Sequence, residues 1–365
     1  MKKIGILTFH CAHNYGAVLQ CYALQEYISQ LGFYVEIIDY CPKYLIEPYS
    51  IFKFNRVLCL NPIKMAKNII WEIILLYKRY KRHVGFDLFI KNALKRSNRV
   101  IDGKISNYYD IYIIGSDQVW NSEITNGYDK IYWGYFPFIK ENRIYATYAA
   151  SMESSNLNSK QIQFIKNALN NFDQISVREN KLVELLSPIT KNKITQVIDP
   201  TLLVDISVWN KIIIKPNITQ KYILVYQVRW NEHTIKIAKK LAKQINAEIL
   251  ELSAYVDRNC LANKYQTKSP GEFVGLIKHA ECIITTSFHG TAFSIIYNKP
   301  FYTIKLNDNR DSRSTSILTA LGLENRILSL TDNPIFENIN YKNVNNILKG
   351  LKLQSQNYLD NILKI

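Results

Sequence analysis

The chain has 365 residues, of which 47% are hydrophobic and 21% are charged, and its formal net charge is +16. Chains longer than about 300 residues usually divide into two hydrophobic cores, and this composition excludes a disordered protein. No apolar run approaches the roughly 20 residues of a membrane-spanning helix, which excludes that class. The six cysteines form no CxxC pair, so we expect reduced thiols in a cytoplasmic protein without a metal site.

The first half of the chain alternates strand and helix patterns. Residues 1–9 turn polar too soon for a signal peptide and predict a buried strand, and a helix pattern follows at 18–31. Further strands are predicted at 33–40, 109–115, 143–151, 174–178 and 194–200, with helical sequence at about 60–97 and 158–172. This alternation is typical of a parallel sheet covered by helices.

The same alternation starts again after residue 205. Strands are predicted at 222–228, 247–253, 281–287 and 300–306, with helices at 232–245, 270–280 and 291–298. The pattern predicts an α/β fold with two Rossmann-like, doubly wound domains that face a cleft at the carboxyl ends of their strands. We expect these domains at 1–205 and 206–335, and a helical tail at 336–365 that packs back on the first domain.

Positive charge is concentrated between residues 53 and 104, in a basic helical insertion of the first domain. Thirteen Lys and Arg residues there face only three acidic ones, so ten of the sixteen net charges lie in this segment. Its centre at 67–83, KNIIWEIILLYKRYKRH, is typical of a helix on an anionic membrane surface. Nucleic acid is the other usual partner, but no zinc-finger, RNA-binding or helix-turn-helix pattern supports it. General enrichment in Lys explains part of the excess.

Four loops at predicted strand ends carry more polar residues than a turn needs. The first, FHCAHNYGAVLQ at 9–20, contains Asn14 as a polar handle for an acceptor molecule. It also contains Gly16, which permits close approach of a ligand to the backbone. The competing interpretation is a plain helix start that Asn14 caps, and the sequence favours neither.

The second loop, IGSDQVWN at 114–121, contains the candidate ligand-binding residues Ser116 and Asp117. Asp117 is the better functional candidate, because it follows a short apolar strand at the expected cleft. Trp120 offers a flat face for a sugar, but a packed core tryptophan is the stronger interpretation.

The third loop, ISVREN at 175–180, places Arg178 at a strand exit. An arginine there points into the expected cleft and can hold a carboxylate or phosphate through two parallel hydrogen bonds. The competing interpretation is a surface salt bridge to Glu179 or Glu184.

The fourth loop, TTSFHGT at 285–291, joins a strand to a helix. Ser287, Gly290 and Thr291 can turn backbone N–H groups toward an anion at the helix N-terminus. His289 is then within reach to transfer a proton. The alternative is a tight turn that needs only the glycine.

Further cations follow the next strand, in the segment FYTIKLNDNRDSR. They are Lys305, Arg310 and Arg313. Such a set suits a small ligand that carries both a carboxylate and a phosphate, because each anionic group needs its own cation.

Several motifs together resemble the polysaccharide pyruvyl transferase family. They are NYGAVLQCYAL, YDIYIIGSDQVWN, TSFHGTAFSIIYNKPF and DSRSTSILTALGLENR, and the resemblance extends from about residue 3 to residue 327. Members of this family resemble glycosyltransferase-B proteins, with two Rossmann-like domains around a cleft. The resemblance implies transfer of the enolpyruvyl group of phosphoenolpyruvate to a sugar, usually as a cyclic ketal. The SFHG motif departs from the R-L-H form of some members, because no arginine directly precedes the histidine.

The resemblance implies a donor-binding role for Arg178, places the family's histidine at His289, and matches its lysine to Lys305, for which Arg310 or Arg313 could substitute. Together with the loops described above, it leads to three sets of expected site residues. His289 and Asp117 are the expected catalytic residues; Arg178, Lys305, Ser287, Gly290 and Arg313 are expected to bind the donor; Asn14, Gly16 and Ser116 are expected to bind the acceptor.

Phosphoenolpyruvate is expected as a co-substrate, with no further cofactor. The expected partners are a sugar acceptor on a lipid carrier and the inner face of an anionic membrane, but no nucleic acid.

Two other functions remain open. One is a glycosyltransferase of the same fold that uses a nucleotide sugar. The other is a binding protein for glycan or nucleic acid, which has no need for the Arg178 and His289 pair.

Overall fold

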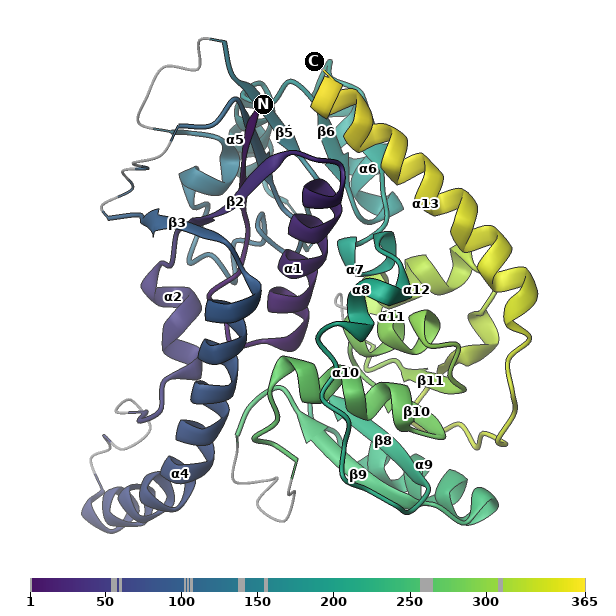
Figure 1. Cartoon of the computed structure of the whole chain (residues 1–365). Coiled ribbons are helices and arrows are strands. Elements are labelled where there is room, and N and C mark those ends of the chain that lie inside the picture. The colour runs from purple at the N-terminus through teal and green to yellow at the C-terminus, as the bar shows by residue number, and fades with distance from the viewer. Residues whose placement is uncertain are drawn as a thin grey trace.

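The computed structural model describes residues 2–53, 58, 61–101, 103, 105, 108–136, 142–153, 157–256, 265–307 and 311–364. Each half of the chain forms a parallel five-stranded sheet (Figure 1). The first sheet has the order β3-β2-β1-β4-β5, with β1 at Lys3–Leu7, β2 at Tyr34–Asp39, β3 at Arg96–Arg99, β4 at Ile111–Ile114 and β5 at Ile144–Thr147. Two short strands, β6 (Ile175–Val177) and β7 (Ile194–Gln196), pair with each other, and single bridges connect β6 to the end of β5.

The second sheet has the order β12-β11-β10-β8-β9. Its strands are β8 (Tyr222–Gln227), β9 (Glu248–Ser253), β10 (Cys282–Thr285), β11 (Phe301–Ile304) and β12 (Ile327–Leu328). The central strands of both sheets are buried on both faces, which explains why they read as continuous apolar runs rather than as alternating patterns. The α/β class with two Rossmann-like units is thereby confirmed.

Helices connect the strands and cover the sheets. In the first half they are α1 (Tyr15–Gln30), α2 (Lys43–Ile46), η1 (Glu47–Tyr49), α4 (Pro62–Ala93), η2 (Lys130–Trp133), α5 (Ser159–Leu169), α6 (Asn180–Leu186) and η3 (Ser187–Ile189). From residue 200 onward they are α7 (Pro200–Leu203), α8 (Ile206–Asn210), α9 (Glu232–Ile245), α10 (Pro270–His279), α11 (Phe288–Ile296), α12 (Asp311–Ala320), η5 (Glu324–Arg326) and α13 (Tyr341–Lys364). Side-chain caps fix several starts: Asn14 accepts from Gly16 N at α1, and Ser269 forms a capping box at α10.

Helix α4 is shorter than the helical stretch predicted at 60–97. It ends at Ala93, and β3 then joins the edge of the first sheet, where Ile37 N donates to Lys95 O over 2.8 Å. The prediction missed β3 because its residues, RSNR, lack the apolar pattern of a strand. Arg82 of α4 reaches the second half, donating to Gln266 O over 2.9 Å and to Ala254 O over 2.8 Å. Among the described residues, no helix combines the length and apolarity needed to cross a bilayer.

The last helix, α13, lies along both halves of the molecule (Figure 1). Tyr358 donates to Thr147 O over 2.8 Å, and Ser355 Oγ accepts from Ile198 N over 3.0 Å. Both partners belong to the part of the chain before residue 205, so the C-terminal helix crosses back to the first sheet.

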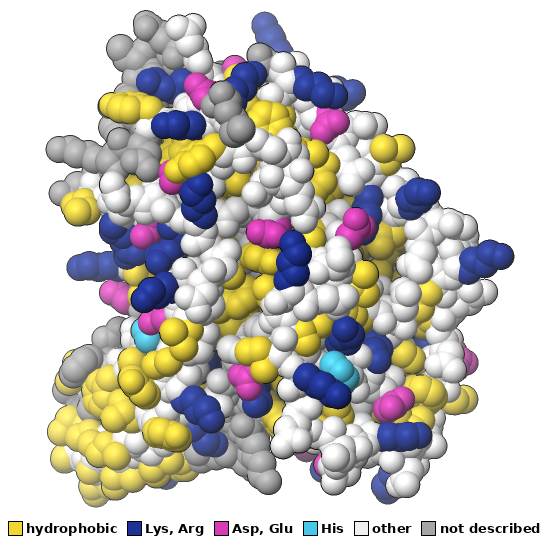
Figure 2. Space-filling view, in the orientation of Figure 1, with side chains coloured by type: hydrophobic (Ala, Val, Ile, Leu, Met, Phe, Trp, Pro, Cys, Tyr) yellow, Lys and Arg dark blue, Asp and Glu magenta, His cyan; other side chains and the backbone are white. Residues whose placement is uncertain are grey.

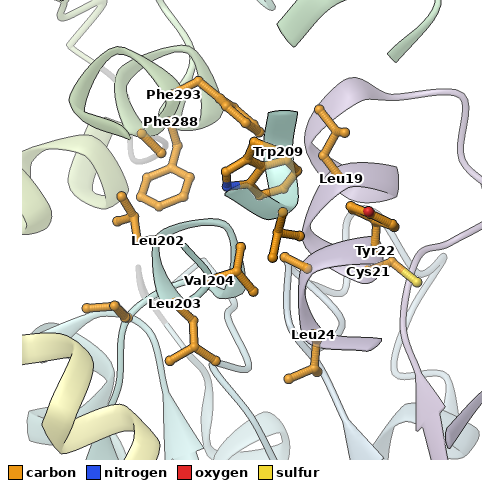
Figure 3. Packing of buried hydrophobic residues seen from close by; sticks show 14 of the residues in the cluster. Leu19, Cys21, Tyr22, Leu24, Leu202, Leu203, Val204, Trp209, Phe288 and Phe293 are labelled. Atoms are coloured by element: carbon orange, nitrogen blue, oxygen red, sulfur yellow. The ribbon is translucent and has the colours of Figure 1, made fainter. Parts of the chain in front are cut away.

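Buried apolar side chains join the two halves (Figure 3). Trp209 of α8 lies at the centre of this joint: its ring centroid is 4.7 Å from that of Phe293 in α11 and 6.0 Å from that of Tyr22 in α1. All three side chains are almost inaccessible to solvent. Because α1 and α11 pack on the same tryptophan, their N-terminal ends are held in a fixed relation, and both ends line the site described next.

Candidate active site

A cleft of about 710 Å³ lies between the two halves of the chain. Its walls include the segments that follow four strands: Asn14 after β1, Asp117 after β4, Arg229 after β8 and His289 after β10. The carboxyl ends of both sheets therefore open onto one cleft, as expected for doubly wound units.

His289 lies against the backbone of Gly16, across the boundary between the halves. A Cβ atom at position 16 would lie 2.5 Å from His289 Cγ and closer still to Nδ1, so only glycine leaves room for the imidazole. The sequence predicts acceptor binding by Gly16, but in the structure this glycine packs against His289 and does not line the cleft. The motifs NYGA and SFHG are thus in direct contact.

Asp199 connects the other polar residues of the site. Its Oδ2 accepts from Arg178 Nη1 over 2.8 Å and from Ser116 Oγ over 3.3 Å, and it lies 3.7 Å from His289 Nε2. Burial by itself raises the pKa of Asp199, but the contact with His289 and the charge of Arg178 outweigh burial and hold this pKa well below its usual range. The carboxylate therefore stays ionised and orients the histidine and the arginine.

Arg178 takes part in a buried ion network, not in the surface salt bridge that was the alternative. Its Nε donates to Glu179 Oε1 over 3.0 Å, and its guanidinium stacks over the ring of Phe288 at 4.7 Å. Burial acts to lower the pKa of Arg178, but Glu179 and Asp199 raise it, so the group keeps its charge. Its Nη2 is buried and has no hydrogen-bond partner among the described residues. Arg178 lines a separate cavity of about 70 Å³ that adjoins the cleft at Phe288.

Arg313 lines both the cleft and the smaller cavity. Burial, together with the nearby positive charges of Arg178 and Arg229, lowers the pKa of Arg313 to about 10, although Asp117 opposes this effect. An anion bound between Arg313 and these arginines would stabilise their charged forms.

Three N–H groups expected to face an anion at the N-terminus of α11 have partners inside the protein, although Ser287 lines the cleft. The N–H of Gly290 donates to Ser287 Oγ over 3.4 Å, that of Thr291 to Ser287 O over 3.0 Å, and that of Ser287 to Thr285 Oγ1 over 3.0 Å. These three groups cap and continue the helix, so the prediction that they face an anion is wrong for this geometry.

Two further assignments also need correction. Ser116 is fully buried beneath the cleft, where it donates to Asp199, and it cannot contact an acceptor. Lys305 lines neither cavity, and Arg310 lies outside the described residues. Asn14 lines the cleft while its side-chain oxygen caps α1, so the helix-cap interpretation is confirmed and acceptor binding by Asn14 stays a prediction. Trp120 is a core residue stacked on Trp133, with ring centroids 4.6 Å apart.

Two residues of the site were missed from the sequence. Asp199 precedes Pro200 at the start of α7, where its Oδ1 accepts from Thr201 N, and a sequence of this kind is typical of an ordinary helix cap. Arg229 lies just past the end of β8 and donates to Asp311 Oδ1 over 2.7 Å. Arg229 carries the same sequence signal as Arg178, because it is also an arginine directly after a predicted strand.

A family model for polysaccharide pyruvyl transferases matches residues 14–308. The chain belongs to this family. It is an enzyme of the polysaccharide pyruvyl transferase type, and a polysaccharide acceptor is implied. Comparison with curated protein sequences gives no match.

Solved structures resemble this pyruvyl transferase at low sequence identity. A UDP-GlcNAc 2-epimerase from Neisseria meningitidis, bound to UDP-GlcNAc, is 12% identical with a TM-score of 0.44, and the match covers 100% of this chain and 93% of the epimerase. The S. aureus MnaA–UDP co-structure is 11% identical with a TM-score of 0.45, covering 97% and 91%. An O-GlcNAc transferase mutant from Thermobaculum terrenum is 9% identical with a TM-score of 0.39; the match covers 99% of this chain but only 64% of that one.

Two clusters of side chains in the pyruvyl transferase have the chemistry of metal ligands. One comprises His10, Cys11 and Cys41; the other comprises His13, His83 and Asp87. Neither cluster was predicted from the sequence, because each is completed by a residue from a distant segment: Cys41 joins His10 and Cys11, and His13 joins His83 and Asp87. Among the described cysteines none forms a disulfide.

Proposed function

We propose that this pyruvyl transferase takes the pyruvyl group of phosphoenolpyruvate and adds it as a ketal to a sugar of a cell-surface polysaccharide or of its lipid-linked precursor. The observation that carries the proposal is a pair of buried polar atoms, Arg178 Nη2 and His289 Nε2. Neither has a hydrogen-bond partner among the described residues, although both belong to side chains that contact Asp199. Buried groups of this kind are normally satisfied, so a ligand is the natural partner.

Phosphoenolpyruvate matches the charge of this region. Its carboxylate and phosphate each accept hydrogen bonds from a guanidinium, and Arg178 and Arg313 line one cavity together. An anion between them relieves the repulsion that lowers the pKa of Arg313. The absence of an arginine directly before His289 is compensated in this proposal by Arg313, which comes from α12.

The reaction needs one proton donor and one proton acceptor. His289 protonates the methylene carbon, which makes C2 electrophilic. One sugar hydroxyl then adds to C2, and a second hydroxyl displaces phosphate to close the ketal. The two hydroxyl groups release two protons: one restores the proton that His289 gave to the methylene carbon, and the other leaves with phosphate. Asp117, on the cleft wall of the first half, orients the acceptor hydroxyls.

The test is thermal unfolding of the purified protein with phosphoenolpyruvate, UDP, UDP-sugars and GDP-sugars in turn. A ligand that binds only the folded state at 100 times its Kd adds about 2.7 kcal/mol of stability. Arg313→Gln is the informative variant, because Arg178→Ala would leave two buried carboxylates without their cation. Lys305→Gln is the matched control, since Lys305 lines neither cavity.

We expect phosphoenolpyruvate to raise the melting temperature of the wild type and of Lys305→Gln, but not of Arg313→Gln. A shift with a nucleotide sugar alone contradicts the proposal and favours a glycosyltransferase of the same fold. Equal shifts in all three proteins place the donor away from Arg313 and refute the assigned site.

The exposed face of α4 is the proposed contact with an anionic membrane, which makes the enzyme a peripheral protein of the inner face. Ile70, Ile73 and Tyr77 are 58%, 61% and 71% exposed, and the hydrophobic patch over the lower end of α4 is visible in Figure 2. Lys64, Lys67 and Lys81 are exposed on the same helix, and this combination of apolar and basic residues suits an interfacial helix.

Two arginines of the basic segment 67–83 do not belong to this contact, which corrects the prediction from the sequence. Arg79 is buried in an ion pair with Glu72, and Arg82 is buried against carbonyl groups of the second half, so neither faces a membrane. Flotation with phosphatidylserine vesicles tests the contact: Ile73→Ser with Tyr77→Ser should abolish binding, whereas neutral vesicles should bind weakly. Binding that survives the double substitution excludes α4 as the docking surface.

A further inference from the structure

The carboxyl ends of β1 and β2 bring two cysteines and a histidine together. These strands are parallel neighbours, with Ile6 opposite Ile37, so the residues after β1 lie beside those after β2. As a result the side-chain nitrogen of His10 and the sulfur atoms of Cys11 and Cys41 all lie within 4.8 Å of one another. His10 is fully buried, and the two cysteines are partly buried.

The spacing of these atoms is close to that of a tetrahedral metal site. Zinc binds sulfur at about 2.3 Å and imidazole nitrogen at about 2.0 Å, which places adjacent sulfur and nitrogen ligands about 3.5 Å apart. Cys41 Sγ lies 3.4 Å from His10 Nε2. Asp39 Oδ1 lies 3.1 Å from Cys41 Sγ and 2.8 Å from His10 Nε2, so it faces the same point.

The orientation of His10 provides a second, independent observation. Its Nδ1 lies 3.3 Å from the carbonyl oxygen of Thr8, while Nε2 faces Asp39 Oδ1 at 2.8 Å and Cys41 Sγ at 3.4 Å. Histidines that bind metals usually donate their other ring N–H to a carbonyl or carboxylate in this way.

We propose that His10, Cys11 and Cys41 bind one thiophilic divalent cation of the Zn²⁺ class, with Asp39 at the fourth position. Binding releases the two thiol protons as one doubly charged ion enters, and Nε2 binds the ion without a proton. The two thiolates neutralise the ion, and Asp39 remains balanced by Arg96 and Arg99, whose Nη1 atoms lie 3.4 and 3.3 Å from its carboxylate.

The ion would fix one wall of the cleft. The loop after β1 carries Ala12 and Asn14 to the cleft, and the segment after β2 leads to Tyr44, which also lines it. A cation between Cys11 and Cys41 ties these two segments together, as structural metal sites do. This inference is independent of the proposed donor and acceptor.

The second cluster, formed by His13, His83 and Asp87, serves as an internal control. Asp87 has a half-exposed side chain, and the cluster offers no sulfur ligand. Thiolate ligands select soft cations. A metal ion bound only by imidazole and carboxylate, as in the second cluster, gives no thiolate-to-metal absorption band.

The experiment is a titration of the full, reduced and chelator-treated chain with Co²⁺ under anaerobic conditions. We expect one equivalent to produce both the visible bands of tetrahedral cobalt and a near-ultraviolet thiolate-to-cobalt band, and Zn²⁺ to displace both. Zn²⁺ should also raise the melting temperature. Cys11→Ser and Cys41→Ser should each remove the thiolate band.

Three control variants should keep the band. They are Cys21→Ala, which changes a buried cysteine of α1; His83→Gln, which disrupts the second cluster; and a double substitution of Cys59 and Cys260, which lie outside the described residues. A fully reduced wild type without a thiolate band overturns the proposal, and this result does not depend on the folding of any variant. A band that survives Cys41→Ser, or disappears in any control, also overturns it.

Discussion

Substituting Gly16 by alanine tests the contact between the two halves of the active site. The new Cβ would lie 2.5 Å from His289 Cγ and closer still to Nδ1, whereas an ordinary contact begins at 3.4 Å, so the imidazole must retreat by more than 1 Å. Overpacking of a filled site costs about 1–3 kcal/mol. A displacement of about 1 Å in a catalytic group can reduce turnover by about 100-fold. We therefore expect Gly16→Ala to lower stability in urea unfolding by about 1–3 kcal/mol.

A double-mutant cycle isolates the clash from other effects of the substitution. In a His289→Ala background the ring is gone, and alanine in a helix is favoured over glycine by up to about 1 kcal/mol. Gly16→Ala should then be neutral or stabilising, so its destabilising effect disappears or reverses. Gly350→Ala in α13 is the control, since its Cβ would meet nothing within 4 Å. If Gly16→Ala costs the same with and without His289, the ring is not seated on this glycine and the reasoning is refuted.

Three further substitutions probe buried charges. Asp199→Asn should destabilise the protein at pH 7 by about 3 kcal/mol, because it leaves Arg178 without one partner. Because the pKa of Asp199 is lowered in the folded protein, its carboxylate stabilises the fold above the ordinary carboxyl pKa of about 4, and this stabilisation is lost as the pH falls further. The stability of the Asn variant, measured by urea unfolding, should therefore fall less steeply below pH 4 than that of the wild type. Burial, followed by the charge of His83, lowers the pKa of His13 to about 4. As the pH falls, His13 of the unfolded chain therefore takes up a proton before His13 of the folded protein does. The free energy of unfolding should fall by about 2 kcal/mol between pH 6.5 and 4 in the wild type, and this fall should be absent in His13→Phe. Arg82→Met should cost about 3 kcal/mol in urea unfolding, because three buried acceptors lose their donor; a loss below 1 kcal/mol would show that the apolar joint alone holds the halves.

Most of the fold follows from the sequence. Parallel strands buried on both faces have a distinctive signature, as in IYII of β4 and CIIT of β10, and the helices between them have clear caps. The expected cleft follows from topology, because polar loops at the carboxyl ends of parallel strands must meet. Strand β3 escaped prediction because its pairing with β2, not its composition, makes it a strand.

The pairings within the site could not be predicted from sequence. Ser116 and Asp117 are adjacent, yet one is buried under the cleft and the other lines it, because the turn after β4 directs them differently. Arg79 and Lys81 are two residues apart on α4, and only tertiary packing decides that the arginine is buried against Glu72 while the lysine is exposed. Charge and residue type are visible in a sequence, but the partner of a charge depends on the final fold.

The two most recognisable motifs of the chain are one physical unit. NYGA needs its glycine because the histidine of SFHG occupies the space of a side chain, and this holds only while α1 and α11 keep their separation within a fraction of an ångström. The apolar joint around Trp209 supplies that constraint, because Leu19 of α1 and Phe293 of α11 pack into the same cluster (Figure 3). A close-packed core resists small displacements. The position of His289 is therefore set by hydrophobic packing beneath it and by Asp199 beside it, which means that the site is assembled when the two halves fold together, before any ligand binds.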